Sequence, residues 1–355
     1  MRIFIDIGHP AHVHYFRNMI ALMHDKGHTF FIVARDKEVT HRLLKQYNLP
    51  YISRGKGSGS ILGKILYLFK ADCQLLKYAK KFNPDIFLSF ASPYAAHVSF
   101  LMNKPHIAFT DTEHAKLGNL AFSYFTKTIL TPGCFRKDFG KKHIKFNGYM
   151  ELAYLHPDYF RADESILEIL KIGKTDKYAV IRFVSWNASH DIGYSGLTYK
   201  NKVDLVKKLS EKCKVFISSE VDLPNEIKKH QLKISPNKMH DVLSFASLFI
   251  GEGATMASES AILGTPSICV KSTEDSTCNE QEEKYSLLYN YKNINGVIAK
   301  AFKILDSDVN DIFLKRRNNM IKDKINVTKF MVWFLENFPD SINYLKLSPN
   351  SKKFN

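Results

Sequence analysis

Paired cysteines are missing from this chain of 355 residues. Its five cysteines are scattered, odd in number, and include no C-x-x-C pair. A disulfide framework and a zinc site both need paired or closely spaced cysteines, so neither is supported. We expect reduced thiols, no metal site and no cofactor.

Long apolar runs are missing as well. No stretch reaches the ~20 apolar residues that a bilayer-spanning helix needs, and the opening residues MRIFIDIGHP contain an acid and no apolar run of signal length. Low-complexity patches are short and 45% of the residues are apolar, which indicates a globular chain of two ordinary domains. We therefore expect a cytoplasmic protein.

Acidic residues are few relative to basic ones, and the formal net charge is +16. Residues 1–160 hold most of the excess, with 22 Lys and Arg against 11 Asp and Glu, whereas residues 161–355 hold 29 against 24. Seven basic residues and a single acid fall within residues 54–81, together with leucines and isoleucines at near-helical spacing. This pattern predicts a basic amphipathic segment.

The amphipathic segment has two interpretations. It could lie on an anionic membrane surface, which would make the protein peripheral on the inner face of the cytoplasmic membrane. Alternatively, its apolar stripe packs against the sheet of its own domain and its lysines are solvated. Nucleic acid is not an expected partner, because no finger-type or aromatic-rich motif accompanies the charge.

A strand-helix-strand pattern occupies residues 248–270, LFIGEGATMASESAILGTPSICV. We expect a strand, a turn containing Gly251, Gly253 and Ala254, a short helix with Thr255 as its N-cap, and a second strand. The glycines let a ligand approach the backbone, and the free amides at the helix start form a site for a phosphate. The alternative is an ordinary turn followed by a short helix.

Glu259 lies four residues after Thr255 on the same face of the expected helix. A capping box would place the acid one position earlier, where Ser258 stands, so a cap does not explain it. Two carboxylate oxygens beside a phosphate site match the paired hydroxyls of a ribose. Glu259 is therefore a candidate ribose ligand, unless it is a solvated surface charge.

The chain resembles domain-of-unknown-function family 354, a group of GT-B-like proteins associated with surface polysaccharide synthesis. The likeness runs from IDIGHPAHVHYF through RFVSWNASHD to the glycine turn and covers most of residues 1–335. It implies two Rossmann-like α/β domains facing across a cleft. Residues 1–155 would bind the acceptor, residues 156–335 the nucleotide-sugar, and residues 336–355 would return to the first domain.

Three histidines crowd the turn after the first expected strand, residues 2–7. A histidine in the first turn of a helix stays neutral, because the positive end of the helix dipole disfavours the imidazolium. We expect His12 to take the proton of an acceptor hydroxyl, and His9 and His14 to contact the acceptor. The alternative is that His9 caps the turn and His14 packs internally.

Further candidates follow other expected strands, where ligands of open α/β sheets gather. Asp111 and Glu113 are expected in acid-base chemistry or, alternatively, in contacts with the acceptor or the sugar, and His97 is expected in acceptor binding. Arg182 could meet the phosphates of the donor or be paired structurally, and His190 lies in a polar loop of the donor domain.

These features predict a metal-independent glycosyltransferase that moves a sugar from a nucleoside diphosphate, with uridine as the expected base, to a polysaccharide or lipid-linked acceptor. A UDP-sugar 2-epimerase is the nearest alternative, although residues 88–90, LSF, lack the acid expected after that strand. A non-catalytic basic protein that binds membranes or nucleic acid is the second alternative.

Overall fold

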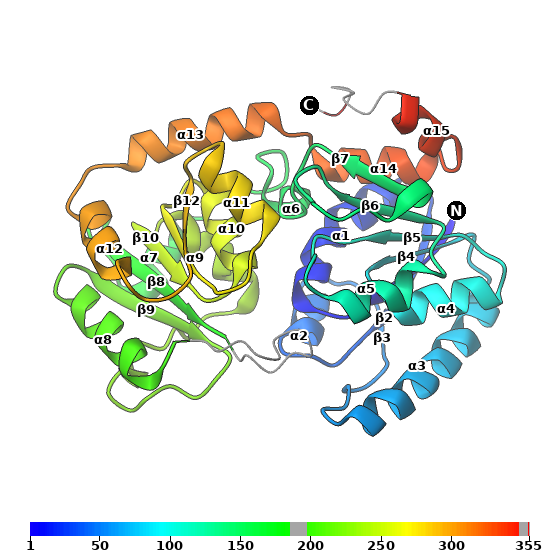
Figure 1. Ribbon diagram of the computed structural model, residues 1–355, viewed down its shortest axis with the longest axis horizontal. Helices are drawn as coiled ribbons and strands as arrows, with labels where there is room; N and C mark the ends of the chain where they lie inside the picture. The colour runs from blue at the N-terminus through cyan, green and yellow to red at the C-terminus, as the bar shows by residue number, and fades with distance from the viewer. Residues whose placement is uncertain (185–196, 348–353, 355) are drawn as a thin grey trace. The chain divides into compact units, whose positions relative to one another are not determined.

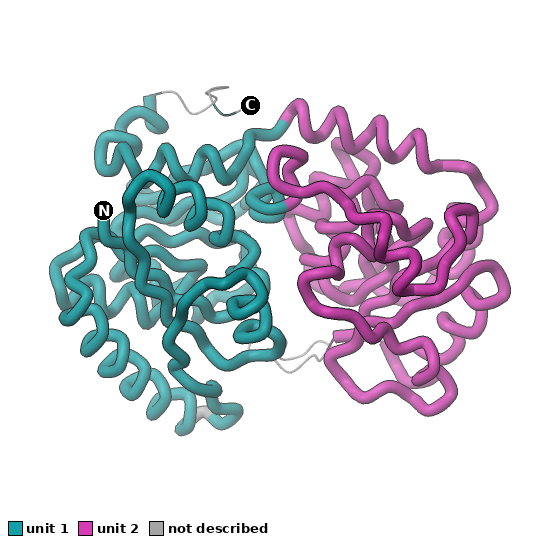
Figure 2. The backbone as a smooth tube through the Cα atoms, turned by 180° about the vertical axis from the view of Figure 1, so that it is seen from behind, with its two compact units in different colours: residues 1–154, 324–355 teal, residues 155–323 magenta. Residues whose placement is uncertain are grey.

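The computed structural model describes residues 1–184, 197–347 and 354, and it divides into two compact units (Figure 2). Unit 1 comprises Met1–Tyr154 and Lys324–Asn355, and unit 2 comprises Leu155–Asp323. Each unit is built on a parallel sheet with helices on its faces (Figure 1). The predicted fold class, two Rossmann-like α/β domains with a C-terminal return to the first, is confirmed.

Unit 1 holds a seven-stranded sheet of order β3-β2-β1-β4-β5-β6-β7. Its strands are β1 (Arg2–Ile7), β2 (Thr29–Ala34), β3 (Ile52–Ser53), β4 (Ile86–Phe90), β5 (His106–Phe109), β6 (Thr128–Pro132) and β7 (His143–Phe146). Its helices are α1 (Pro10–Asp25), α2 (Thr40–Gln46), α3 (Ile61–Phe82), α4 (Pro93–Leu101), α5 (Lys116–Ser123), η1 (Gly140–Lys142), α14 (Val327–Glu336) and α15 (Asp340–Leu347), and α6 (Leu152–Leu155) ends at the unit boundary.

Unit 2 holds a five-stranded sheet of order β12-β11-β10-β8-β9. Its strands are β8 (Tyr178–Phe183), β9 (Lys214–Ser219), β10 (Leu248–Gly251), β11 (Ser267–Val270) and β12 (Leu288–Tyr291). Its helices are α7 (Ser165–Leu170), α8 (Tyr199–Ser210), η2 (Lys228–His230), η3 (Pro236–Lys238), α9 (Met239–Ser244), α10 (Ala254–Leu263), α11 (Ser276–Glu283), α12 (Val297–Leu305) and α13 (Asn310–Asp323).

The strand order reverses once in each sheet. In unit 1 the chain runs outward from β1 to β3 and then crosses to β4, so the reversal lies between β1 and β4. In unit 2 it runs from β8 to β9 and then crosses to β10, so the reversal lies between β8 and β10. The crossover loops diverge at such a point and leave a crevice at the carboxyl ends of the two strands, where ligands bind.

The segment that returns to unit 1 begins at Lys324, earlier than the predicted residue 336. The amide of Ile325 donates to the carbonyl of Asn147 over 2.9 Å, and Thr328 Oγ1 donates to the carbonyl of Ala153 over 2.6 Å. Helix α14 packs on α1 and buries the apolar face formed by Phe330, Met331 and Phe334. This burial explains the earlier return.

Helix α1 illustrates how local sequence positions the unit 1 site. Pro10 occupies its first turn, where a missing amide hydrogen costs nothing, and Gly27 follows its end with a φ of 84°. Val13, Phe16 and Ile20 form its buried stripe against the sheet.

Across the described residues, every helix is too short or too polar to cross a bilayer.

Candidate functional site

The start of α10 is open to solvent at the switch point of unit 2. Gly253 is the N-cap residue, with φ −109° and ψ 131°, and no side chain among the described residues makes a capping hydrogen bond there. Residues 253–256 are half-buried, whereas residues 257–263 are buried. The amides of Ala254, Thr255 and Met256 therefore lie at an accessible helix N-terminus, which favours an anion.

The prediction that Thr255 caps this helix is wrong. The helix begins at Ala254, so Thr255 is its second residue. Gly253 takes the extended cap conformation, and its carbonyl accepts from the amide of Ala257 over 3.4 Å. The hydroxyl of Thr255 is thereby placed in the first helical turn, beside the open amides.

The two glycines of the turn differ in what they do. A Cβ on Gly251 would lie 2.6 Å from the Phe249 ring and 3.2 Å from Cβ of Arg182, so packing requires a glycine there. Among the described residues, a Cβ on Gly253 would meet only Val184 Cγ1, at 3.4 Å. Packing therefore explains Gly251, whereas Gly253 keeps the approach to the open amides clear.

Glu259 is buried, which excludes the alternative that it is a solvated surface charge. Only 5% of the residue is exposed, and Nε2 of His240 donates to its Oε1 over 3.1 Å. His240 lies on α9, which packs against α10. A carboxylate inside the protein is costly unless it is hydrogen-bonded, and His240 meets part of that need. The sequence contains His240 but no spacing that pairs it with Glu259.

Arg182 lies beside the glycine turn and is already paired. Its register partner on β10 is Gly251. Its guanidinium donates to Ser218 Oγ over 2.7 Å and to Oε1 of Glu220. The structural pairing that the sequence left open is therefore present, and it holds the guanidinium at the carboxyl edge of the sheet.

Glu252 is a site feature that the sequence analysis did not identify. It is 2% exposed and its carboxylate accepts from the amides of Val184 and Leu197. Lys202 Nζ lies 3.7 Å from it. The carboxylate therefore holds together the end of β8 and the start of α8.

The predicted residue His190 lies outside the described residues.

The switch point of unit 1 contains His12, whose ring is neutral and accepts a hydrogen bond. The amide of Gly8 donates to its Nδ1 over 3.3 Å, so its proton is on Nε2, and its ring lies 4.8 Å from that of Phe90. Burial first, then neighbouring positive charges, hold the pKa of His12 well below its usual value. The prediction of a neutral ring agrees with this geometry. The accepting nitrogen is occupied, however, which disfavours the predicted role as a base.

His9 and His14 have structural partners. Nδ1 of His9 accepts from the amide of Ala11 over 3.2 Å and caps α1. His14 is buried, with its ring 5.1 Å from that of Tyr154 and its Nδ1 3.4 Å from the hydroxyl of Tyr47. Capping and packing therefore account for the positions of both rings.

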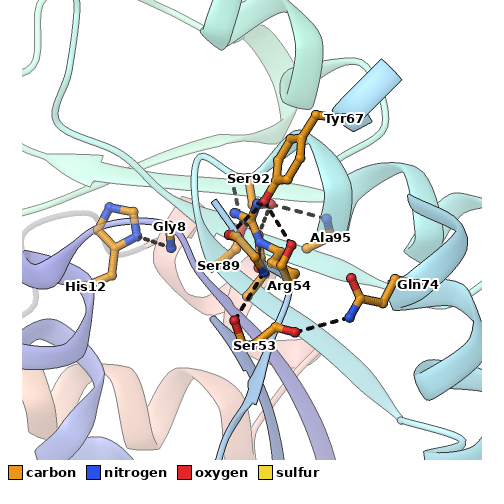
Figure 3. Close-up of polar contacts among 11 residues, drawn as sticks. Gly8, His12, Ser53, Arg54, Tyr67, Gln74, Ser89, Ser92 and Ala95 are labelled. Atoms are coloured by element: carbon orange, nitrogen blue, oxygen red, sulfur yellow. Dashed lines mark hydrogen bonds and ion pairs between the residues drawn. The ribbon is translucent and has the colours of Figure 1, made fainter. Parts of the chain in front are cut away.

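A buried ion pair of Arg54, whose side chain is labelled in Figure 3, stands at the same switch point and was not foreseen. Nε of Arg54 donates to Oδ1 of Asp6 over 2.8 Å, and Ser92 Oγ donates to Oδ2. The Arg54 side chain also donates to the hydroxyl of Tyr67 over 2.6 Å. Asp6, an acid between Ile5 and Ile7 in the buried part of β1, was the available signal. This network ties β1, the residue after β3 and the start of α4 together.

The two predicted carboxylates after β5 differ in their surroundings. Asp111 is half-buried and its Oδ1 accepts from Thr112 Oγ1 over 3.0 Å. Glu113 accepts from the amide of Arg136, and its carbonyl accepts from Lys137 Nζ. Glu113 thus fixes the loop after β6, and the acid-base role of Asp111 stays a prediction.

His97 joins three helices. Its Nδ1 lies 2.9 Å from Oδ2 of Asp72 on α3, and its Nε2 lies 3.2 Å from the carbonyl of Ala121 on α5. The hydrogen bond to Asp72 is the largest cause that raises its pKa. The predicted acceptor contact would compete with both bonds. No group of three or more metal-ligating side chains occurs in the described part of the chain.

Comparison with known proteins places this geometry in context. A family model described as "Protein of unknown function (DUF354)" matches residues 1–333. The uncharacterised protein MJ0665 of Methanocaldococcus jannaschii is 28% identical over 278 residues, which is 75% of this chain and 80% of that protein.

Several solved structures share the fold. UDP-GlcNAc 2-epimerase from Neisseria meningitidis, bound to UDP-GlcNAc, is 12% identical with a TM-score of 0.66 and covers 95% of this chain and 100% of its own. The spinosyn forosaminyltransferase SpnP is 12% identical with a TM-score of 0.65 and covers 97% and 99%. The UDP-GlcNAc 2-epimerase of M. jannaschii in complex with UDP-GlcNAc and UDP is 12% identical with a TM-score of 0.65 and covers 87% and 94%. The fold is thus GT-B, as the sequence predicted.

Proposed function

Since the chain belongs to the family described as protein of unknown function (DUF354) and has the GT-B fold, we propose that it is a glycosyltransferase. It moves a sugar from a nucleoside diphosphate, with uridine as the base, to a glycan or lipid-linked acceptor in surface glycan synthesis. Unit 2 binds the donor and unit 1 binds the acceptor. The protein works in the cytoplasm and reaches a lipid-linked acceptor as a peripheral protein.

The open N-terminus of α10 is the observation that carries this proposal. It stands at the switch point of unit 2, its first turn is accessible, and no described side chain caps it. The amides and the dipole of that turn attract negative charge and suit a diphosphate. Solved structures with the same fold include proteins bound to UDP and UDP-GlcNAc, which supports uridine as the base.

Each donor-site residue receives a role from its position. The amides of Ala254 and Thr255 bind the diphosphate, and the absence of a side chain at Gly253 lets it approach. Glu259, oriented by His240, accepts a hydrogen bond from a ribose hydroxyl. Because the amides are fixed before the reaction, they stabilise the charge of the departing diphosphate without reorganising.

The transfer needs a base that takes the acceptor proton and a leaving group that takes the electron pair of the broken bond. The acceptor oxygen forms a bond to the anomeric carbon, the bond from that carbon to the diphosphate oxygen breaks, and the electron pair leaves with the nucleotide. We assign Asp111 as the base that takes the acceptor proton, while Nε2–H of His12 donates to an acceptor oxygen. Glu113 positions the neighbouring loop. No metal takes part in this scheme, so turnover should persist in excess EDTA.

A UDP-sugar 2-epimerase is the second candidate, because such enzymes are among the solved structures of this fold. The two reactions differ at C2 of the sugar, since epimerisation removes and returns the proton there. Incubation with UDP-GlcNAc in D₂O distinguishes them by NMR. A transferase leaves C2 of recovered UDP-GlcNAc protonated, whereas deuterium at C2 and a second epimer would establish the epimerase and overturn the proposed transfer.

A further inference from the structure

Helix α3 has two halves with opposite environments. In the second half Ala71, Leu75 and Ala79 are buried, and the last two pack with Phe4 and Phe87 in the core of unit 1. In the first half four large apolar side chains are exposed, namely Leu62 (74%), Ile65 (49%), Leu66 (66%) and Phe69 (65%). The sheet of unit 1 therefore covers the apolar residues of only one half.

The four exposed residues form a single stripe, called the α3 stripe below. Their spacing of three, one and three residues places them on one side of a helix. Singly exposed apolar residues are ordinary, but a contiguous apolar face on a surface helix marks an interaction site. The α3 stripe is therefore a candidate interaction surface.

Exposed basic side chains accompany this stripe along α3. Six exposed lysines lie on α3 or in the loop before it: Lys56, Lys64, Lys70, Lys77, Lys80 and Lys81. Asp72, the acid of this helix, is hydrogen-bonded to His97, and Arg54 is buried in its pair with Asp6. The surface charge of the helix is thus positive almost throughout.

Exposed apolar side chains also occur on α4, which packs against α3, and on α5, which packs against α4 (Figure 1). His97 links α3, α4 and α5 through its two ring nitrogens. These neighbours expose five more large side chains, Phe100, Leu101, Leu117, Leu120 and Tyr124. The carbonyl of Tyr124 accepts from Lys142, which lines a hollow of about 260 Å³ together with Lys127, Lys141 and Lys346. Exposed apolar residues therefore occur on α3, α4 and α5, and further lysines lie near the end of α5.

We propose that the α3 stripe inserts into the surface of an anionic lipid bilayer, with the accompanying lysines on lipid phosphates. An amphipathic helix with a basic polar face lies in the membrane interface, where apolar burial and attraction to anionic lipids add together. Each basic residue near such a surface strengthens binding by roughly fivefold at moderate salt. No spanning helix is needed.

An anionic bilayer fits this face better than a second copy of the chain. A symmetric dimer would place the same face of both molecules together. The six lysines of one copy would then meet the six of the other, and like charges brought together at an interface oppose association. A lipid surface supplies the opposite charge along the whole stripe.

The helix that carries the stripe also contacts the switch point of unit 1. Tyr67 of α3 accepts a hydrogen bond from Arg54, which pairs with Asp6 at that switch point. A bilayer against the stripe would therefore be separated from the proposed acceptor site by the thickness of α3. Resting on the proposed function, this identifies the acceptor as a lipid-linked sugar rather than a soluble glycan.

Vesicle sedimentation with the full chain tests the docking surface. The parent should sediment with vesicles of phosphatidylglycerol and phosphatidylcholine and remain in solution with phosphatidylcholine alone. The Leu66→Glu, Phe69→Glu variant should bind the anionic vesicles at least tenfold more weakly. The matched control is Ile169→Glu, Ile312→Glu, which adds the same charge at exposed apolar residues of unit 2 and should bind like the parent.

Three outcomes would overturn the proposal. The first is a parent that fails to bind anionic vesicles at low salt. The second is a stripe variant that binds these vesicles as well as the parent. The third is a parent that is a dimer in sedimentation velocity while the stripe variant is a monomer. Circular dichroism shows that each variant is folded. UDP titration of the same proteins reports the donor site separately, so a failure of docking and a failure of the proposed function can be told apart.

Discussion

Nε2 of His240 on α9 donates a hydrogen bond of 3.1 Å to Oε1 of Glu259 on α10, and both side chains are buried. The bond fixes the orientation of a carboxylate that stands five residues after the open first amide of α10. It also makes Glu259 part of the packing of unit 2. Substitution at Glu259 should therefore affect both ligand binding and stability.

Glu259→Gln separates these two effects. The amide oxygen can still accept from His240, so the melting temperature should fall only slightly, whereas the ribose loses a charged acceptor. The expected loss in UDP binding is about 1.5–3 kcal/mol by calorimetry. Glu211→Gln, an exposed change of the same kind on unit 2, is the control and should bind UDP as the parent does. Equal affinity in the Glu259 variant would remove its ribose role.

The glycine turn offers a matched pair. Gly251→Ala should lower the free energy of unfolding by roughly 1–3 kcal/mol, because its Cβ would overlap the Phe249 ring. Gly253→Ala adds a methyl group whose one contact within the described residues is Val184, and it changes an N-cap, so its cost should stay below about 1 kcal/mol. The affinity of the Gly253→Ala variant for UDP should nevertheless fall at least tenfold, because the added methyl group obstructs the approach to the open amides of α10. The reverse pattern in thermal unfolding and calorimetry would contradict both assignments.

His12 should keep its proton on Nε2 from pH 8 down to pH 6. The amide of Gly8 occupies Nδ1, and burial lowers the pKa of the ring. Nitrogen NMR of histidine-labelled protein reports the tautomer, and His12→Gln identifies the signal by its loss. A protonated Nδ1, or an imidazolium near pH 6.5, would restore His12 as a candidate base.

His106 should make unit 1 sensitive to acid. Burial lowers its pKa from 6.5 to about 3, so between these values the unfolded chain binds a proton that the folded chain does not. Its contribution to stability is complete above pH 6.5 and is lost as the pH falls toward 3, at about 1.4 kcal/mol per pH unit. The melting temperature of His106→Gln should fall less between pH 7 and pH 5 than that of the parent. Parallel curves for the two proteins would contradict the shift.

Local pattern was sufficient to predict the motif around α10. The predicted order of strand, helix and strand is present within residues 248–270, because glycines and buried apolar runs specify the strands β10 and β11. The helix start was placed two residues late, since a glycine cap leaves no side-chain signal.

Tertiary contacts were beyond local pattern. Asp6 and Arg54 are 48 positions apart, and no periodicity pairs an acid in one strand with a base after another. The α3 stripe shows a similar limit, because hydrophobic spacing predicts an apolar face and not the partner that covers it. The exposure of the stripe is a tertiary property, because the core of unit 1 buries apolar residues of the second half of α3 and leaves those of the first half exposed.

Calorimetric titration of UDP into the full chain, with EDTA in the buffer, tests the central claim most directly. The account predicts saturable binding of one UDP per chain, weaker binding of 2′-deoxy-UDP, and a loss of affinity in Gly253→Ala and Glu259→Gln. A chain that binds neither UDP nor any other nucleoside diphosphate, but binds anionic vesicles or duplex DNA with steep salt dependence, would contradict it and identify a non-catalytic basic protein.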